Sequence, residues 1–433
     1  MSPITVGFIG IAILLVLLFS RMQIGVAMGL VGFCGFAYII GFDAALGLLK
    51  TVPYATFSQQ SLSVIPLFIL MGSFCFSAGI SEDLYRGIHK WLGHLRGGLA
   101  TATVVACACF AAISGSSLAT VATMGKVAMP EMRRYNYSAA LATGSIAAGG
   151  SMGILIPPSV ILIIYGIITE QSIGKLFLAG FIPGLLEGIF YIITIRVITG
   201  RDPKAGPRGP EAPFREKIMA LRSTWEVAIL FLVVIGGIYL GWFTPTEAAG
   251  VGAFGAFLLT IIRKKLNRNS FVKSLVDTSM TSGMLFAIIL GAMVLGYFLS
   301  VTRLPHELAT VVSTLPVNRY VILILILITT LVLGCVMDSM AIVLLTIPVF
   351  YPLILELGFD PIWFGILVVR VTEMGLITPP VGLNVYVIKG ISGTPMRTVF
   401  KGIYPFLIAD LCEVILLIAF PQITLFLPNL MDI

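Results

Sequence analysis

Two helix-breaking units recur 222 positions apart in this chain. The first unit joins Ser116-Ser117 to residues 152–158, which read MGILIPP, and the second joins Asp338-Ser339 to residues 374–380, which read MGLITPP. The match needs no gap, so it is hard to ascribe to a shared preference for apolar residues. Glycine and proline inside an apolar segment break a helix. Such breaks at corresponding places in two halves of a chain are typical of a transporter's binding site.

Composition places the chain in a membrane. Of its 433 residues, 58% are hydrophobic and only 11% are charged, whereas a soluble domain has about 25% charged residues. The net charge of +7 comes from Lys and Arg in short connections between apolar runs, which form no continuous basic patch. We therefore predict an all-α polytopic membrane protein that contacts membrane lipid and does not bind nucleic acid.

Apolar runs predict the elements of the first half, because a membrane-spanning helix needs about 20 apolar residues. Residues 98–114 and 117–129 are each short for a span and are separated by a Ser-Gly-Ser-Ser tetrad, so we predict a re-entrant hairpin. Its tip is tolerable only where protein or water surrounds it. The predicted elements are spans at 4–20, 22–41 and 62–80, an interfacial helix at 81–97, this hairpin, a broken helix at 138–169 and a span at 176–199.

The second half repeats this plan after a basic linker at 200–222. The predicted elements are spans at 225–242, 244–262 and 276–300, an interfacial helix at 303–318, a hairpin at 319–352 with its tip at Asp338-Ser339, a broken helix at 361–388 and a last span at 402–427. This makes about 10 full spans, two re-entrant hairpins and two broken helices.

These elements group into regions with different roles. We predict scaffold spans (1–80 and 223–302), interfacial helices (81–97 and 303–318), a transport region made of the hairpins and broken helices (98–169 and 319–390), the span region 170–199, the linker 200–222 and the last span region 391–433.

The number of crossings fixes the relation between the halves. Each half crosses the membrane five times, which is odd, so the second copy enters upside down as an inverted-topology repeat. The positive-inside rule agrees with this orientation. Lys and Arg gather on one predicted side, at Arg21, 81–97, Arg133-Arg134, 200–222, 263–273 and 389–401, while the opposite connections, such as the loop at 42–61, hold few. Both termini are therefore expected outside the cytoplasm, with the first hairpin entering from the cytoplasm and the second from the other side.

Some sequence strings match enzyme motifs, but the residues around them do not fit an enzyme active site. Residues 149–153 fit the G-x-S-x-G pattern, but no strand precedes them and the three histidines, His89, His94 and His306, lie in predicted interfacial stretches. There is no Walker sequence. We expect a transporter driven by an ion gradient, not an enzyme, and no organic cofactor.

The duplicated units favour ion binding. Hairpin tips and helix breaks leave backbone carbonyls without intrahelical partners, and sodium takes oxygen ligands at such discontinuities. We predict two sodium positions, one formed by Ser114, Ser116, Ser117, Gly153 and Ile156 and one formed by Asp338, Ser339, Gly375 and Thr378. The alternative for each single serine is a hydroxyl bonded back to the preceding helical turn.

The same tips suit an anionic substrate, because half-helix N-termini carry partial positive charge. The predicted substrate contacts are Ser116, Ser151, Pro157, Arg370, Pro379 and Asn384. Arg370 lies three residues before Glu373 on one helix face, so it either pairs with Glu373 or meets a substrate carboxylate. Glu187, Asp410 and Glu413, in other spans, are expected to contact a partner subunit or to lie near helix ends.

Several strings resemble the large membrane subunit of tripartite ATP-independent periplasmic (TRAP) transporters. They are residues 91–100, 114–121, 153–159, 337–338 and 375–384, and the resemblance covers essentially the whole chain. Two residues depart from the family pattern. Thr123 replaces what is more often a small apolar residue, and Arg370 replaces what is more often an uncharged one.

The resemblance implies an elevator-type sodium symporter in a bacterial inner membrane. It implies a small four-span membrane subunit on a separate chain, a periplasmic substrate-binding protein, and a small organic anion as substrate, such as a C4-dicarboxylate, sialic acid or another sugar acid. One alternative is a stand-alone sodium- or proton-coupled anion transporter of the same plan. A third class is a membrane scaffold or channel that does not transport.

Overall fold

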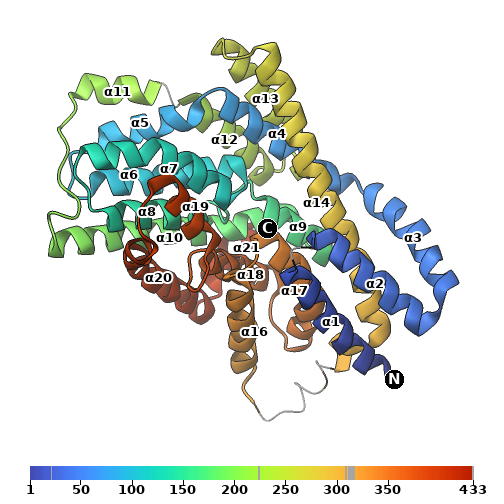
Figure 1. The fold of residues 1–433 in the computed structure, drawn as a ribbon. Helices are drawn as coiled ribbons and strands as arrows, with labels where there is room; N and C mark the ends of the chain where they lie inside the picture. Colours follow the sequence, from blue (N-terminus) through green and yellow to red (C-terminus); the bar gives the residue numbers. More distant parts are fainter. Residues whose placement is uncertain (21, 223–224, 308–309, 311–316, 432–433) are drawn as a thin grey trace.

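The computed structural model describes the chain except residues 21, 223–224, 308–309, 311–316 and 432–433. All regular elements in the described part are helices (Figure 1). The first half contains α1 (Pro3–Phe19), α2 (Ile24–Ile40), α3 (Phe42–Phe57), η1 (Gln60–Ser63), α4 (Val64–Ser77), α5 (Ile80–Leu92), α6 (Gly98–Ser114), α7 (Ser117–Arg134), α8 (Ala139–Met152), α9 (Val160–Thr169) and α10 (Ile173–Arg201). The second half contains α11 (Phe214–Arg222), α12 (Trp225–Tyr239), α13 (Pro245–Ile262), α14 (Arg268–Thr302), α16 (Arg319–Gly334), α17 (Ser339–Glu356), α18 (Pro361–Gly375), α19 (Leu383–Ser392), α20 (Met396–Ala419) and α21 (Gln422–Leu430).

The all-helical membrane fold predicted from the sequence is confirmed. Among the described residues, six helices are long and apolar enough to cross a membrane on their own. Others, such as α1 and α2, are apolar but slightly shorter. The two hairpins are formed by α6 with α7 and by α16 with α17, and the two broken helices by α8 with α9 and by α18 with α19.

Two predicted segments differ from the structure. The stretch 42–61 was expected to be a loop, but residues 42–57 form α3, which has one buried face despite Asp43, Lys50 and Pro53. The last span was expected over 402–427, but α20 ends at Ala419 and α21 follows Pro421. The residue before a proline disfavours the helical conformation, and Phe420 leaves it with φ −128° and ψ 75°.

The linker and the interfacial segments differ in how much the structure describes. The linker 200–222 includes α11, whose Glu216 accepts from the Lys90 Nζ of α5 at 3.2 Å and whose Lys217 carbonyl accepts from the Trp91 indole at 3.0 Å. The first interfacial segment, 81–97, is largely the helix α5, whose position at a membrane surface stays a prediction. The second, 303–318, lies partly outside the described residues.

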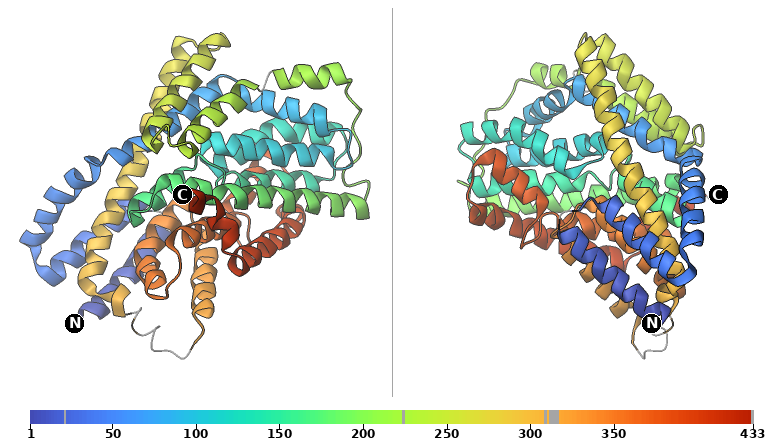
Figure 2. Two further views of the ribbon diagram at one scale, coloured as in Figure 1. Left: turned by 180° about the vertical axis from the view of Figure 1, so that it is seen from behind. Right: turned by 45° about the vertical axis from the view of Figure 1, so that its right-hand side comes forward.

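Packing between the halves is reciprocal. Helix α2 packs against α14 and its repeat counterpart α13 packs against α4, while α7 packs against α19 and its counterpart α17 packs against α9. Helix α8 likewise packs against α20, and α18 against α10. Figure 2 shows α14 as a long helix that runs diagonally, with the hairpins and broken helices on one side of it. These exchanged contacts are what a duplicated unit produces when its copies interlock.

Glycine allows the closest of these crossings. The Gly144 position of α8 and the Gly402 position of α20 face each other so closely that a Cβ on either would overlap the backbone of the other helix. Gly25 of α2 lies in the same way against Ala287 of α14. Small residues at such crossings let helix backbones approach within a membrane.

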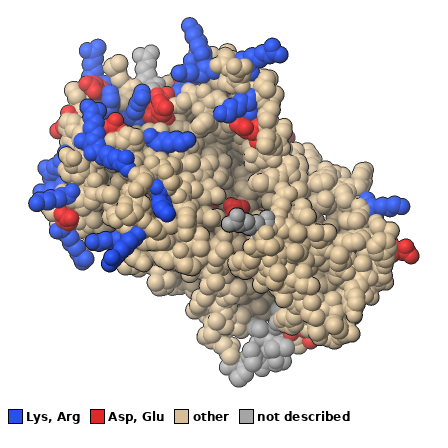
Figure 3. Space-filling view, in the orientation of Figure 1, with Lys and Arg blue, Asp and Glu red and all other residues tan. Residues whose placement is uncertain are grey.

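Basic side chains gather at one end of the molecule. Figure 3 shows Lys and Arg concentrated over the end that carries α5, α11 and the connection between α13 and α14, with few on the opposite end. At this end the Arg263 guanidinium pairs with Asp83 at 2.7 Å and with Glu226 at 2.6 Å, which ties α13 to α5 and α12.

Candidate functional site

The first hairpin brings hydroxyl groups to the N-terminus of a half-helix. Gly115 ends α6 with φ +63°, a left-handed conformation that glycine adopts readily. Ser116 then caps α7, and its Oγ accepts from the Ala119 amide at 3.3 Å. Ser114 Oγ lies 3.0 Å from Thr120 Oγ1, and Ser117 is buried. The three predicted serines therefore lie together at one tip.

The second hairpin places a carboxylate at the equivalent point. Asp338 is the N-cap residue of α17, but its side chain makes no capping hydrogen bond. Ser339 is buried at the first position of this helix. The Cys335 carbonyl, just before the tip, accepts from the Gly382 amide at 3.0 Å, which holds the tip against the second helix break.

Each break begins at a glycine that touches its own hairpin. A Cβ at Gly153 would overlap Ala111 of α6, and a Cβ at Gly375 would lie 2.6 Å from Gly334 Cα of α16. Any larger residue would therefore push hairpin and break apart. The equivalent role of the two glycines explains why both units retain them.

The two breaks differ in whether their backbone carbonyl oxygens already accept hydrogen bonds. Among the described residues, no backbone amide donates to the carbonyls of Gly153 or Ile156. The Gly375 carbonyl, in contrast, accepts from the Thr378 amide at 3.0 Å. Thr378 Oγ1 also donates to the Met374 carbonyl at 2.7 Å, which is the back-bonded arrangement left open for single hydroxyls. The first break thus has the more available backbone acceptors.

Glu373 joins the two hairpin tips. Ser339 Oγ donates to Glu373 Oε1 at 2.6 Å, and Ser117, the equivalent residue of the first hairpin, lies near the same carboxylate. The Glu373 side chain is only 1% exposed, and its Oε2 has no hydrogen-bond partner in the described protein. Equivalent residues of the two repeats therefore meet at one buried carboxylate.

Sequence reasoning missed this role of Glu373. It considered Glu373 only as a partner for Arg370, because the two lie one turn apart on the same helix. Residue spacing along α18 cannot reveal that Ser339, from α17, lies within hydrogen-bonding distance. One available signal was the position of Glu373, which corresponds to the predicted substrate contact Ser151 after the 222-residue shift.

The predicted substrate contacts lie around the breaks. Asn384, in the first turn of α19, is fully buried, and both its amide oxygen and its amide nitrogen lack partners among the described residues. Ser151 Oγ donates back to the Ala148 carbonyl at 2.7 Å. Pro157 and Pro379 occupy equivalent places in the two breaks. An unpartnered buried amide costs about 1–3 kcal/mol, so Asn384 is the strongest of these candidates for a ligand contact.

Arg370 has a different environment from the one expected. Its side chain is fully buried and lies 3.3 Å from Glu187, 2.6 Å from Asp410 and 2.9 Å from Glu413. It forms no ion pair with Glu373 in the described structure, so the self-neutralising pair, one of the two alternatives for Arg370, is wrong. The three acidic residues surround Arg370 inside the chain. The direct substrate contact of Arg370 stays a prediction, and its enclosure by carboxylates does not favour it.

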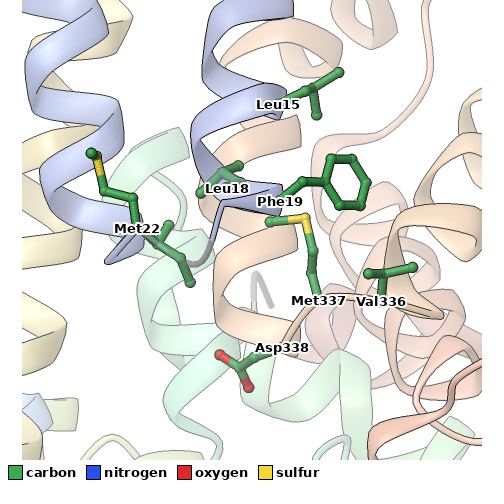
Figure 4. A pocket seen from close by; sticks show the side chains of 8 residues that line it. Leu15, Leu18, Phe19, Met22, Val336, Met337 and Asp338 are labelled. Atoms are coloured by element: carbon green, nitrogen blue, oxygen red, sulfur yellow. The ribbon is translucent and has the colours of Figure 1, made fainter.

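A cavity of about 230 Å³ opens beside the second tip. Figure 4 shows the Asp338 carboxylate at its edge, below Met337, with Leu18 and Phe19 of α1 across from it. The cavity separates α1 from the connection between α16 and α17. Asp338 is thus a tip residue that borders a cavity.

Known proteins similar to this chain include transporter subunits. The chain is 37% identical to the C4-dicarboxylate TRAP transporter large permease protein of Pseudomonas aeruginosa, with 90% of this chain and 93% of that protein covered. It is 35% identical to the sialic acid TRAP transporter large permease protein of Vibrio cholerae, with 86% of each covered. It is 32% identical to the isethionate TRAP transporter permease protein of Oleidesulfovibrio alaskensis, with 94% of this chain and 64% of that protein covered.

A solved structure has the same fold. The crystal structure of the YdaH transporter of Alcanivorax borkumensis superposes with a TM-score of 0.65 at 14% sequence identity, over 89% of this chain and 90% of that one. The family described as the DctM component of the tripartite ATP-independent periplasmic transporter matches residues 11–423. Since this match spans nearly the whole chain and the relatives agree with it, the chain belongs to the DctM family of TRAP transporter large permeases.

Proposed function

We propose that this chain is the large transmembrane subunit of a sodium-coupled importer of an organic acid. The observation that carries the proposal is the meeting of Ser117 and Ser339 at the buried carboxylate of Glu373. These serines begin equivalent half-helices, α7 and α17, whose N-termini carry partial positive charge. A carboxylate between two such ends, with one oxygen unpartnered, is suited to hold a cation while the helix ends face an anion.

We propose two sodium positions, one at each hairpin tip. One would use the hydroxyls of Ser114, Ser116 and Ser117 with the open carbonyls of Gly153 and Ile156. The other would use Asp338, Ser339, Gly375 and Thr378, with Glu373 as an added ligand or neighbour of both positions.

The substrate would lie between these positions. The relatives are named for C4-dicarboxylates, sialic acid and isethionate, which are all organic anions. Ser116, Ser151, Pro157, Pro379 and Asn384 are the contacts proposed for such an anion, and the unpartnered amide of Asn384 supports the last of them.

The proposed working complex contains two further proteins. These are a small four-span membrane subunit and a periplasmic substrate-binding protein, in a bacterial inner membrane. The basic end seen in Figure 3 would face the cytoplasm, with both termini on the periplasmic side.

We propose an inverted repeat that works as an elevator. Its support is the reciprocal packing of the halves and the cavity between α1 and the second hairpin, where a moving core would slide along fixed spans. In a background without native cysteines, cross-linking Leu18→Cys to Val336→Cys, which line this cavity, should stop uptake. Single-cysteine variants serve as controls, and undiminished uptake after complete cross-linking would refute movement at this boundary.

The central experiment measures uptake in proteoliposomes that contain this chain and its small subunit. With the binding protein present, uptake of the binding protein's ligand should require an inward sodium gradient. Uptake that ignores the sodium gradient would contradict the proposal. Uptake without any binding protein would favour the alternative, a stand-alone sodium- or proton-coupled anion transporter of the same plan.

A further inference from the structure

The Arg370 cluster, defined as Arg370, Glu187, Asp410, Glu413 and Tyr191, is a second group of buried polar side chains in the core. Its members come from α10, α18 and α20, and the side chains of Arg370 and its three acidic partners are all 0% exposed. Tyr191 is also fully buried, with its ring 5.3 Å from that of Phe406. None of these residues belongs to the duplicated units.

The cluster has an imbalance of charge. Arg370 supplies one positive charge, which a guanidinium keeps under all ordinary conditions. Glu187, Asp410 and Glu413 supply up to three negative charges. Two uncompensated carboxylates in a buried membrane site are expensive, and an ionisable group in that position takes up a proton instead.

The hydrogen bonds of the cluster also indicate, independently of charge, that its carboxylates take up protons. Ionised carboxylates only accept, so three of them share the few donors of Arg370. In the described structure, both oxygens of Glu187, one oxygen each of Asp410 and Glu413, and the Tyr191 hydroxyl have no hydrogen-bond partner, and on the donor side Arg370 Nη1, 3.3 Å from Glu187, is unpartnered. Each added proton turns one of these acceptors into a donor for a neighbour. A bound metal is a weaker explanation, because the described residues contain no group of His, Cys, Asp or Glu arranged to hold one.

The contacts also rank the three carboxylates. Asp410 and Glu413 accept hydrogen bonds from Arg370 at 2.6 and 2.9 Å. Glu187 approaches at 3.3 Å without a hydrogen bond. Its ionised form is therefore the least stabilised of the three.

Charged residues on the neighbouring helices are exposed or paired elsewhere: Arg319 of α16 and Glu356 of α17 are exposed, and Glu226 of α12 pairs with Arg263. Helices α8, α9 and α21, which pack against its elements, contain no Asp, Glu, Lys or Arg. On α18 the other charged group is Glu373, whose side chain is held by Ser339. Among the remaining titratable groups, Tyr165 of α9 donates to the Pro361 carbonyl at 2.6 Å. Lys389 of α19 lies over the Tyr386 ring at 5.9 Å.

We propose that Glu187, Asp410 and Glu413 form a proton-binding site in the core of this transporter, separate from the sodium positions. The site holds two protons when the cluster is neutral. Glu187 carries the first as a carboxylic acid, and Asp410 and Glu413 share the second beside Arg370. The site is independent of the proposed sodium coupling, since none of its residues lies at a hairpin tip or break.

Infrared spectroscopy of the purified chain in lipid tests the proposal, because a protonated carboxyl has its own C=O stretching band. Glu187→Gln, which mimics a neutral acid, should fold and should lose one such band near neutral pH. Asp410→Asn should change the second band. Glu356→Gln removes an exposed carboxylate at the end of α17 and should leave these bands unchanged.

A second readout is the pH dependence of thermal unfolding. Carboxyl groups of an unfolded chain are ionised near neutral pH, so a folded state that binds protons loses stability as pH rises. The wild-type midpoint should fall between about pH 6 and pH 9, and Glu187→Gln should flatten that slope.

Several results would overturn the proton site. Unchanged bands in both Glu187→Gln and Asp410→Asn would do so, as would bands that shift with sodium concentration at fixed pH, which indicate a cation site. If Glu187→Gln fails to accumulate while Asp410→Asn accumulates, Glu187 is not a neutral acid in the wild type. Sodium-independent uptake would contradict the proposed function and leave this proposal intact.

Discussion

The hydrogen bond between Ser339 and Glu373 gives the sharpest test of the central site. The Ser339→Ala substitution removes the hydroxyl that donates to Glu373 at 2.6 Å. The Glu373 carboxylate is only 1% exposed, so neither of its oxygens then accepts a hydrogen bond from the second hairpin. A hydrogen bond to a charged group contributes about 1.5–3 kcal/mol. Since 1.4 kcal/mol is a factor of ten, an equilibrium that depends on this bond should shift by about 10- to 150-fold.

The assay is a sodium titration of uptake in proteoliposomes, together with the thermal unfolding midpoint in detergent. Ser339→Ala should raise the half-saturating sodium concentration by at least about tenfold and lower the midpoint. Ser339→Thr keeps the hydroxyl and should behave nearly as wild type. Ser117→Ala, the equivalent change in the other repeat, should have a smaller effect because Ser339 still holds Glu373.

A double-mutant cycle separates this contact from a general loss of packing. Combining Ser339→Ala with Glu373→Ala removes both partners, so the combined cost in stability should be less than the sum of the single costs by about 1–3 kcal/mol. Additive costs, or equal effects of Ser339→Ala and Ser117→Ala, would refute the view that Glu373 is bound chiefly by the second hairpin.

Three further predictions concern packing, charge and ligand binding. Gly402→Leu should destabilise the protein by about 1–3 kcal/mol or prevent folding, measured as the thermal midpoint, because α20 crosses Gly144 of α8 without room for a side chain. Arg263→Gln should cost about 1 kcal/mol in the same measurement, since its pairs with Asp83 and Glu226 are only partly buried. Asn384→Leu should leave the midpoint unchanged or raised, because it removes an unpartnered buried amide, yet should reduce uptake at limiting substrate by about tenfold or more.

Periodicity and helix breakers carried most of the fold prediction. The hairpins and broken helices were placed correctly because their ends are local: Gly115, Ser116 and Asp338 mark helix boundaries by backbone conformation and capping. The α3 helix was not recognised because Asp43, Lys50 and Pro53 lower its apolar character below that of a span. Its helical state depends on packing against α2 and α14, which local sequence does not report.

The sequence predicted where the site lies but not which side chains contact one another there. Ser117, Ser339 and Asn384 were named because they lie at tips and breaks. The partners of Arg370 come from α10 and α20, far from it in sequence, whereas the short separation along α18 had offered Glu373 as one of two alternatives. Charged residues in apolar spans show that a compensating partner exists. They do not show which helix supplies it.

Unequal charge at equivalent positions leads to a last prediction. Ser116 corresponds to Asp338 and Ser151 to Glu373, so both carboxylates of the site belong to the second half. Because like charges repel strongly away from water, an anionic substrate between the two sodium positions should lie nearer the first tip, and the second tip should bind its sodium ion more tightly than the first. Ser116→Ala removes one of several neutral oxygens at the first sodium position and a proposed substrate contact, so it should raise the substrate KM several-fold and half-saturating sodium by less. Asp338→Asn removes a charged ligand and should raise half-saturating sodium by about tenfold or more. Both quantities come from the same proteoliposome titration. If each variant altered both quantities equally, the two tips would bind ion and substrate as one unit, and the difference in charge between them would not separate the two ligands.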